Sequence, residues 1–213
     1  MKNQSSSTGK KVALIGATGN AGSRILSELE RRSYSVTAIV RDVARVPRSS
    51  GTTARSADVA DVRALADAVA GNEILISSLL FEASDPAKLI RAARDSGVSR
   101  YIVVGGAGSL EISPGLTVLQ SGKVPALYRN ESAAGVRFLQ MLHETPPELD
   151  WTFISPSAEF VAGDRTGVFR LGADSLLIDA NGRSWISYED FAVALVNEIE
   201  TGAHRRRRLT VGY

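Results

Sequence analysis

The chain has no cysteine and only two histidines among its 213 residues. The absence of cysteine excludes a disulfide framework, a thiolate nucleophile and a cysteine-ligated metal. Two histidines also argue against a histidine-built metal site, so we expect no metal. The fold must therefore be stabilised by packing alone.

A strong net charge and long apolar runs are lacking as well. The formal net charge of +2, from 25 basic and 23 acidic residues, is too small to predict a nucleic-acid partner. No apolar run is long enough to cross a bilayer, and the polar segment Met1–Gly9 has no apolar signal-peptide core. We expect a cytoplasmic protein without a membrane partner, a monomer or homodimer, with a disordered tail over 1–9 and one domain over 10–213.

One basic run, Arg205–Arg208, precedes a short apolar stretch at Leu209–Val211. We interpret the run as a solvated turn that leads into a charged edge strand. A patch for nucleic acid or for a membrane surface is the alternative hypothesis.

The segment from Lys11 to Gly22 has the sequence Lys-Val-Ala-Leu-Ile-Gly-Ala-Thr-Gly-Asn-Ala-Gly. The first glycine suits a tight turn after a strand, the second leaves bare backbone for a pyrophosphate, and the third allows close helix packing. Free N–H groups at the start of the following amphipathic helix attract phosphate. An ordinary structural turn is the alternative. We predict a dinucleotide site that includes Gly16, Thr18, Gly19, Asn20, Ala21 and Gly22.

Strand and helix patterns alternate after this motif. Strands are predicted at 12–15, 36–40, 53–57, 73–79 and 100–105, and further helices at 61–70 and 85–96. The strands are continuously apolar, which is typical of a parallel sheet covered on both faces. The pattern predicts an α/β fold of the Rossmann type, a doubly wound parallel sheet with helices on both faces and a small C-terminal substrate-side region.

Two regions interrupt the alternation. Residues 106–127 are rich in glycine and have no period, so we expect a long loop there. Residues 156–185 are expected to hold short strands, with 166–171 and 176–179 paired as a hairpin. The substrate-side elements would thus span about 106–130 and 156–186. The Ser-x-x-acid pattern at Ser187 predicts the start of a closing helix with Asp190 as a capping residue; a catalytic acid is the alternative.

Five segments carry a family resemblance over nearly the whole chain. They are Gly16-Ala-Thr-Gly-Asn-Ala-Gly22, Val36-Thr-Ala-Ile-Val-Arg-Asp42, Val103-Val-Gly-Gly-Ala-Gly-Ser-Leu-Glu111, Asp150-Trp-Thr-Phe-Ile-Ser-Pro156 and Ile186-Ser-Tyr-Glu-Asp-Phe-Ala192. The chain resembles atypical short-chain dehydrogenase/reductase relatives known as NADH-flavin reductases or NAD(P)H-binding proteins. That family is similar in fold to biliverdin-type flavin reductases and to NmrA-like redox sensors, which differ in function.

Arg41 follows the second predicted strand, where the ribose of the cofactor is recognised. An acidic side chain there would bind the 2′-hydroxyl of NAD, whereas a guanidinium pairs with the 2′-phosphate of NADP. NADP(H) is therefore favoured, and NAD(H) stays open because Asp42 is adjacent and acidic. A surface turn with no ligand role is the alternative. The resemblance also implies that Asp58 lies near the adenine.

Other strand ends are expected to contribute to the cofactor channel and to the nicotinamide pocket. Polar strand ends without a ligand role are the alternative, and Phe160 is a candidate for stacking on an acceptor or for the core. The predicted residues at these strand ends are Ser77, Ser78, Leu79, Gly105, Ser155 and Pro156.

The catalytic candidates are Tyr128 and Ser109. Short-chain dehydrogenases pair a tyrosine with a lysine four residues later, but Tyr128 is followed by Ser132 in that position. Without the cation, Tyr128 would be a poor acid–base catalyst and fits better as a loop anchor or pocket wall. Ser109 and Ser155–Ser157 could orient an acceptor. His143 and His204 receive no role.

These observations leave three functional hypotheses. The first is an NADPH-preferring oxidoreductase that transfers hydride to a flavin or a similar planar acceptor, which requires the protein mainly to position two rings. The second is a non-catalytic redox sensor that binds NADP(H). The third, an epimerase or dehydratase, is weakened by the missing Tyr–Lys pair.

Overall fold

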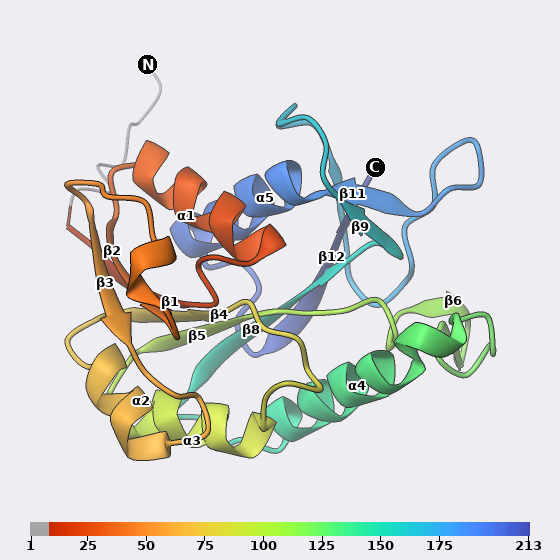
Figure 1. The fold of residues 1–213 in the computed structure, drawn as a ribbon. Coiled ribbons are helices and arrows are strands. Elements are labelled where there is room, and N and C mark those ends of the chain that lie inside the picture. Colours follow the sequence, from red (N-terminus) through yellow and green to blue (C-terminus); the bar gives the residue numbers. More distant parts are fainter. Residues whose placement is uncertain (1–8) are drawn as a thin grey trace.

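The computed structural model describes residues 9–213, so most of the predicted tail lies outside the described residues. An eight-stranded sheet forms the centre of the molecule, in the order β10-β12-β8-β5-β4-β1-β2-β3 (Figure 1). The order reverses between β1 and β4, which is the switch point where open α/β sheets bind ligands. The strands are β1 (Lys11–Ile15), β2 (Ser35–Val40), β3 (Thr52–Ser56), β4 (Ile74–Ser77), β5 (Arg100–Val104), β8 (Asp150–Pro156), β10 (Arg170–Gly172) and β12 (Arg207–Gly212).

Seven of these strands run parallel, and β10 pairs antiparallel with β12. The helices are α1 (Asn20–Arg31), α2 (Val62–Val69), α3 (Pro86–Asp95), α4 (Arg129–His143) and α5 (Tyr188–Thr201). Helices α1 and α5 cover one face of the sheet, and α2, α3 and α4 cover the other (Figure 1). The predicted Rossmann-type doubly wound fold is confirmed.

Local capping explains where several helices begin. The carboxylate of Asp61 accepts from the N–H groups of Arg63 and Ala64, each at 3.0 Å. Asp85 accepts from Ala87 N at 2.9 Å, and Pro86 occupies the first helical position, where its missing N–H carries no penalty.

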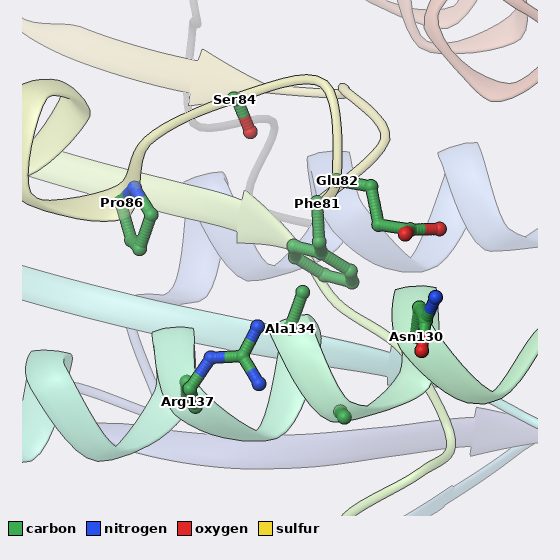
Figure 2. Close-up of a pocket in the computed structure, with 8 residues that line it drawn as sticks. Phe81, Glu82, Ser84, Pro86, Asn130, Ala134 and Arg137 are labelled. Carbon is green, nitrogen blue, oxygen red and sulfur yellow. The ribbon is translucent and has the colours of Figure 1, made fainter.

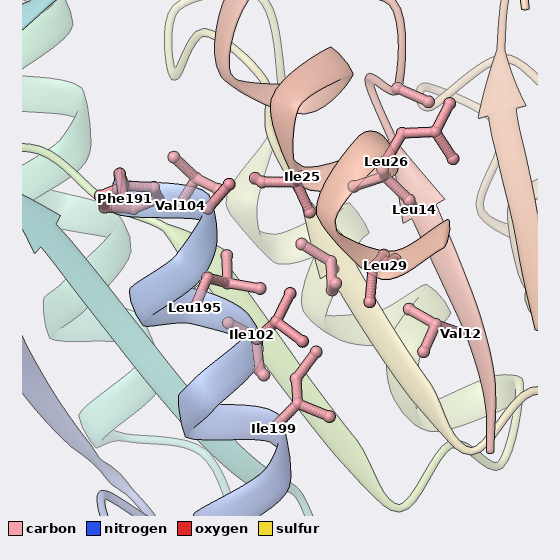
Figure 3. Packing of buried hydrophobic residues seen from close by; sticks show 14 of the residues in the cluster. Val12, Leu14, Ile25, Leu26, Leu29, Ile102, Val104, Phe191, Leu195 and Ile199 are labelled. Atoms are coloured by element: carbon pink, nitrogen blue, oxygen red, sulfur yellow. The ribbon is translucent and has the colours of Figure 1, made fainter. Parts of the chain in front are cut away.

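Two apolar clusters lie on either side of the sheet. On the α1–α5 side, Ile25, Leu29 and Leu195 pack against strand residues such as Leu14 and Ile102 (Figure 3). Because successive side chains of a strand point to opposite faces, the neighbours Ala13 and Val103 belong to the cluster under α2, α3 and α4. Burial on both faces explains the continuous apolar strands.

Residues 106–127 are not the featureless loop that the sequence predicts. They contain a small antiparallel pair, β6 (Glu111–Ser113) with β7 (Leu116–Thr117), and a 3₁₀ turn starts at Ala126. The loop is also fixed by tertiary contacts, since Glu111 N donates to Asp174 O at 2.8 Å. Such long-range contacts leave no periodic pattern in the sequence.

The predicted hairpin between 166–171 and 176–179 is wrong. Residues Arg170–Gly172 pair instead with the C-terminal strand β12. A separate parallel pair joins β9 (Glu159–Val161) to β11 (Trp185–Ser187). The two segments are close in sequence, which is why a hairpin is predicted. In the structure, β10 pairs with the edge of β12, which is distant in sequence.

The basic run is also more structural than the sequence predicts. Strand β12 lies between β8 and β10, so it is not an edge strand. Arg206 donates to the carbonyl oxygens of Thr145, Pro146 and Leu149 at 2.9–3.0 Å. Arg208 is nearly buried and pairs with Asp174. These side chains therefore fasten loops to the sheet.

Asp190 does not act as the predicted cap. Ser187 caps α5, because its Oγ accepts from Asp190 N at 3.0 Å. The buried carboxylate of Asp190 instead accepts from Gly167 N at 2.7 Å and from the Tyr213 hydroxyl at 2.8 Å. Asp190 thus ties the 163–168 segment and the C-terminal residue to α5.

No helix within residues 9–213 is long and apolar enough to cross a membrane. The same residues contain no group of three or more His, Asp or Glu side chains that could hold a metal ion.

Candidate functional site

The carboxyl ends of β1, β4, β5 and β8 meet at one edge of the sheet. Ile15 pairs with Ser77, Ser77 with Val103, and Val104 with Ile154. The residues that follow continue this alignment, since Ser78 N donates to Ile15 O at 3.0 Å and Gly105 N to Ile154 O at 2.8 Å. The structure therefore brings the predicted strand-end residues together.

Gly16 and Gly22 are required by the protein itself. Gly16 has a φ of +81°, and a Cβ there would lie 2.1 Å from Ser78 O. A Cβ on Gly22 would lie 2.0 Å from Gly16 O. Both approaches are to backbone, which cannot yield as a flexible side chain would, so the turn and the close start of α1 depend on these two glycines.

Gly19 differs, because the protein leaves space around it. A Cβ at Gly19 would meet nothing closer than Gly16 O at 3.4 Å, which is an ordinary contact. Gly19 is the exposed N-cap of α1, no side chain caps this end, and the first turn has no acidic residue. The first N–H groups of the helix have no partner within the helix. This cradle fits a pyrophosphate held by backbone N–H groups.

The neighbours of Gly19 have different environments. Thr18 is partly exposed and Ala21 is buried. Asn20 is exposed, and its carbonyl oxygen accepts from the Ser23 hydroxyl at 3.1 Å. Thr18 and Asn20 are therefore the accessible side chains beside the cradle.

Arg41 and Asp42 follow β2 and behave differently. Asp42 starts a 3₁₀ turn over Val43–Arg45, because its carboxylate accepts from Ala44 N at 3.0 Å. Arg41 is exposed, and within residues 9–213 its guanidinium has no hydrogen bond or ion pair. The carboxylate therefore has a structural task, whereas the guanidinium is available to a ligand.

Asp58 is exposed just beyond β3. Its carboxylate accepts from Ala60 N at 2.9 Å, which stabilises the turn before α2. The expected position near the adenine stays a prediction.

Ser77 does not line a channel through its side chain, contrary to the prediction. It is buried, and its Oγ lies 2.9 Å from the hydroxyl of Tyr101. Burial raises the pKa of Tyr101, while the Ser77 hydrogen bond acts in the opposite direction. Ser78 and Leu79 do border the cradle, because a Cβ on Gly16 would lie 3.3 Å from the Leu79 side chain.

The residues at the end of β8 are also buried. Ser155 is fully buried, and its Oγ has no hydrogen-bond partner among the described residues. Pro156 is buried beside Val211 in the sheet. A buried hydroxyl cannot contact an acceptor at the surface, so the predicted orienting role of Ser155 is not supported. Gly105 is needed for packing, since a Cβ there would lie 2.4 Å from the Phe153 ring.

The catalytic candidates lack the arrangement of a proton relay. Ser109 is held by Arg208, whose Nη1 donates to its Oγ at 2.7 Å and to its carbonyl oxygen at 2.8 Å. Tyr128 is 58% exposed at the start of α4. Ser132, in the slot of the missing lysine, lies against Gly108. Within residues 9–213, neither Ser109 nor Tyr128 is paired with a general base.

Phe160 is partly buried against other aromatic rings, and the exposed His143 and partly exposed His204, which received no role, each contact one neighbouring side chain. Phe160 contacts the rings of Tyr188 and Phe191 at centroid distances of 4.5 and 4.7 Å, so the core interpretation of Phe160 is the better one. His143 lies edge-on to Trp151 at 4.9 Å, and the Nδ1 of His204 is 2.7 Å from Glu198.

The sequence analysis missed Glu131. Its two carboxylate oxygens accept from Phe81 N at 2.7 Å and from Glu82 N at 2.9 Å. The first turn of α4 thereby holds the loop that leaves β4. The only sequence signal for this contact is an acidic residue in the first turn of a helix. Such a residue more often indicates a favourable interaction with the helix dipole.

A cavity of about 380 Å³ lies between this loop and α4 (Figure 2). Phe81 borders it from the loop side, and Asn130, Ala134 and Arg137 border it from α4. None of the predicted cofactor residues lines this cavity. This cavity is therefore separate from the predicted cofactor residues.

Comparisons with known proteins agree with this geometry. A family model described as NAD(P)H-binding matches residues 16–201. The uncharacterized protein YwnB of Bacillus subtilis is 34% identical over 94% of this chain and 97% of its own. A structure from Bacteroides thetaiotaomicron, described as a candidate epimerase, is 36% identical with a TM-score of 0.91, covering 96% of this chain and 97% of its own.

Two further structures differ in how much they show. One from Streptococcus pneumoniae, described as a candidate NADH-flavin reductase, is 31% identical with a TM-score of 0.83, covering 96% of this chain and 99% of its own. A short-chain dehydrogenase/reductase from Veillonella parvula in complex with NADP covers 96% of this chain and 94% of its own, but at 16% identity and a TM-score of 0.77 it shows the fold alone. With the family model spanning most of its length, the chain belongs to the NAD(P)H-binding family of Rossmann-type proteins.

Proposed function

We propose that the protein is an NADPH-preferring reductase that transfers hydride to a flavin or a similar planar acceptor. The observation that carries this proposal is the open backbone at Gly19, together with an exposed Arg41 whose guanidinium has no hydrogen bond or ion pair among the described residues. An uncapped helix N-terminus suits a pyrophosphate, and a free guanidinium suits a 2′-phosphate.

Different residues along the sheet edge would bind different parts of the cofactor. The turn from Gly16 to Gly22 would hold the pyrophosphate, and Arg41 would bind the 2′-phosphate on the β2 side. Asp58 would lie near the adenine, which leaves the ends of β4 and β5 for the nicotinamide half. When bound, the cofactor supplies the hydride.

The described residues at the sheet edge include no paired acid, and this favours a planar acceptor over a simple ketone. Tyr128 has no cation in the expected slot, and Ser109 is held by Arg208. A flavin or quinone delocalises the charge it gains and can take its proton from solvent, so the protein needs only to position the two rings.

The same observation supports a second candidate, a redox sensor that binds NADP(H) without turnover. An epimerase ranks below both, although one relative is described as a candidate epimerase. Epimerisation through a carbonyl needs a proton relay, which the described side chains at this edge do not form.

Steady-state oxidation of NADPH in the presence of added flavin mononucleotide tests the proposal. We expect flavin-dependent NADPH oxidation above the uncatalysed background, faster than with NADH at equal subsaturating concentration. Tight cofactor binding with no oxidation by any flavin or quinone would favour the sensor instead.

We also propose a cytoplasmic location, because pyridine nucleotides are supplied inside the cell. One structural relative from Burkholderia pseudomallei, 38% identical with a TM-score of 0.86, is described as a candidate exported protein. Cell fractionation with an antibody distinguishes the two compartments.

A further inference from the structure

Three large apolar side chains are exposed near the carboxyl ends of β4 and β5. Leu80 is 68% exposed, Leu127 is 79% exposed and Tyr128 is 58% exposed. Leu80 lies three residues beyond the end of β4, and the other two immediately precede α4. Apolar side chains that are exposed close together mark a binding surface more often than single exposed apolar residues do.

Tertiary contacts bring these segments to one place. Glu131 holds the backbone of Phe81 and Glu82, next to Leu80, against the first turn of α4. Gly108, in the loop after β5, packs so closely on the same turn that a Cβ would lie 2.1 Å from Ser132 Oγ. The loops that leave β4 and β5 therefore converge where Leu127 and Tyr128 enter α4.

The turn before α4 is itself held in place. Tyr128 N donates to Pro125 O at 2.9 Å, and Arg129 Nε donates to Val124 O at 3.1 Å. Val124 is buried, so it anchors the turn to the core. Leu127 and Tyr128 are thus exposed on a fixed turn.

We infer that Leu80, Leu127 and Tyr128 form a platform for the ring system of a planar, apolar acceptor. This inference rests on the proposed function, because it takes the nicotinamide half of the cofactor to lie at the ends of β4 and β5. An aromatic ring and two aliphatic side chains suit the face of an isoalloxazine or naphthoquinone ring.

Glu131 would be a positioning residue for this platform. It does not touch the acceptor, but it fixes Leu80 relative to the start of α4. The neighbouring Glu82 offers a matched control, because only its backbone N–H takes part in the clamp and its carboxylate forms no ion pair among the described residues.

The test compares Leu127→Gln and Tyr128→Ser with Leu171→Gln. Leu171 is 53% exposed on β10, which β12, β8 and β5 separate from β4. The probes are riboflavin, which has no phosphate, and menadione. We expect the KM for each probe to rise about fivefold or more in the platform variants, with kcat and the NADPH dissociation constant within about twofold of wild type. Leu171→Gln should change none of them.

Glu131→Gln should raise the acceptor KM as well, whereas Glu82→Gln should not. A raised KM with an unchanged melting temperature would separate positioning from a loss of folding. An acceptor KM that is unchanged in the platform variants, or raised equally by Leu171→Gln, would overturn the inference.

A binding measurement keeps the inference testable if the protein does not turn over. Riboflavin fluorescence is titrated with wild type and Leu127→Gln in the presence of NADP⁺. Quenching by wild type that weakens in the variant supports the platform even where the reductase proposal fails. No binding of riboflavin or menadione by wild type overturns it. Sedimentation of wild type and Leu127→Gln tests whether a second copy of the chain covers these residues instead. A wild-type dimer that dissociates in Leu127→Gln would overturn the inference.

Discussion

The two halves of the sheet contrast in how they hold their loops. In the half from β1 to β3, the close start of α1 depends on a contact within the strand–turn–helix unit itself, because a Cβ on Gly22 would lie 2.0 Å from Gly16 O. In the half from β5 to β10, loops are fastened by side chains from distant segments, as when Arg208 holds Ser109 and Asp174. Local chemistry therefore builds the first half, and long-range polar contacts build the second.

The largest expected effect tests the local chemistry. Gly22→Ala places a Cβ 2.0 Å from Gly16 O, far inside contact distance, so we expect the free energy of unfolding to fall by about 2–3 kcal/mol. Urea denaturation measures it. Gly19→Ala is the matched control, with a stability within about 0.5 kcal/mol of wild type but weaker binding of both cofactors. Equal destabilisation by the two substitutions would contradict the distinction between a packing glycine and a ligand-facing one.

Arg208→Ala tests the long-range contacts. The substitution leaves Ser109 and Asp174 without their partner, and we expect a loss of about 2 kcal/mol in urea denaturation. Arg205→Ala should cost about 0.5 kcal/mol, because Arg205 is largely exposed in its pair with Asp150. If the two variants were equally stable, Arg208 would contribute no more than an exposed arginine, and the basic run would be a solvated turn as the sequence predicts.

Asp190→Asn should separate stability from cofactor binding. An amide in place of the carboxylate keeps one acceptor oxygen, which can face Gly167 N, but sets its NH₂ group against the hydroxyls of Thr166 and Tyr213, which donate to the other carboxylate oxygen. We expect a loss of about 1–2 kcal/mol in thermal unfolding, with an NADPH dissociation constant within twofold of wild type. A tenfold weaker affinity for NADPH would place Asp190 in the functional site after all.

Arg41→Ala should have the smallest effect on folding and a selective effect on ligand binding. Since the Arg41 guanidinium forms no hydrogen bond or ion pair among the described residues, stability should stay within about 0.5 kcal/mol. Loss of a charge-assisted contact of about 1.4 kcal/mol corresponds to a tenfold weaker NADPH affinity by calorimetry, with NADH unchanged. Arg63→Ala on α2 controls for the lost surface charge. Equal losses for both cofactors would rule out a 2′-phosphate contact.

Sequence reasoning worked where structure follows from local patterns. The glycine spacing, the Asp85–Pro86 helix start and the apolar strands each have a short-range physical cause, and all are found in the structure. It failed for Ser77, whose polarity at a strand end gave no indication of the buried Tyr101 that it meets.

The substrate side could not be predicted because its order comes from distant partners. Nothing around Thr166 indicates that Asp190 and Tyr213 will fix this segment, and nothing around Phe81 indicates that Glu131 will hold it. The sequence likewise does not indicate that the side chains of Leu80 and Leu127 are exposed, because apolar residues are usually buried.

Calorimetric titration of the purified protein with NADPH and with NADH tests the central claim most directly. The account predicts that both cofactors bind at a single site per chain and that NADPH binds about tenfold more tightly, because only NADPH carries the phosphate that Arg41 would pair with. Equal affinities would contradict the role of Arg41. No heat of binding with either cofactor would contradict the dinucleotide cradle itself.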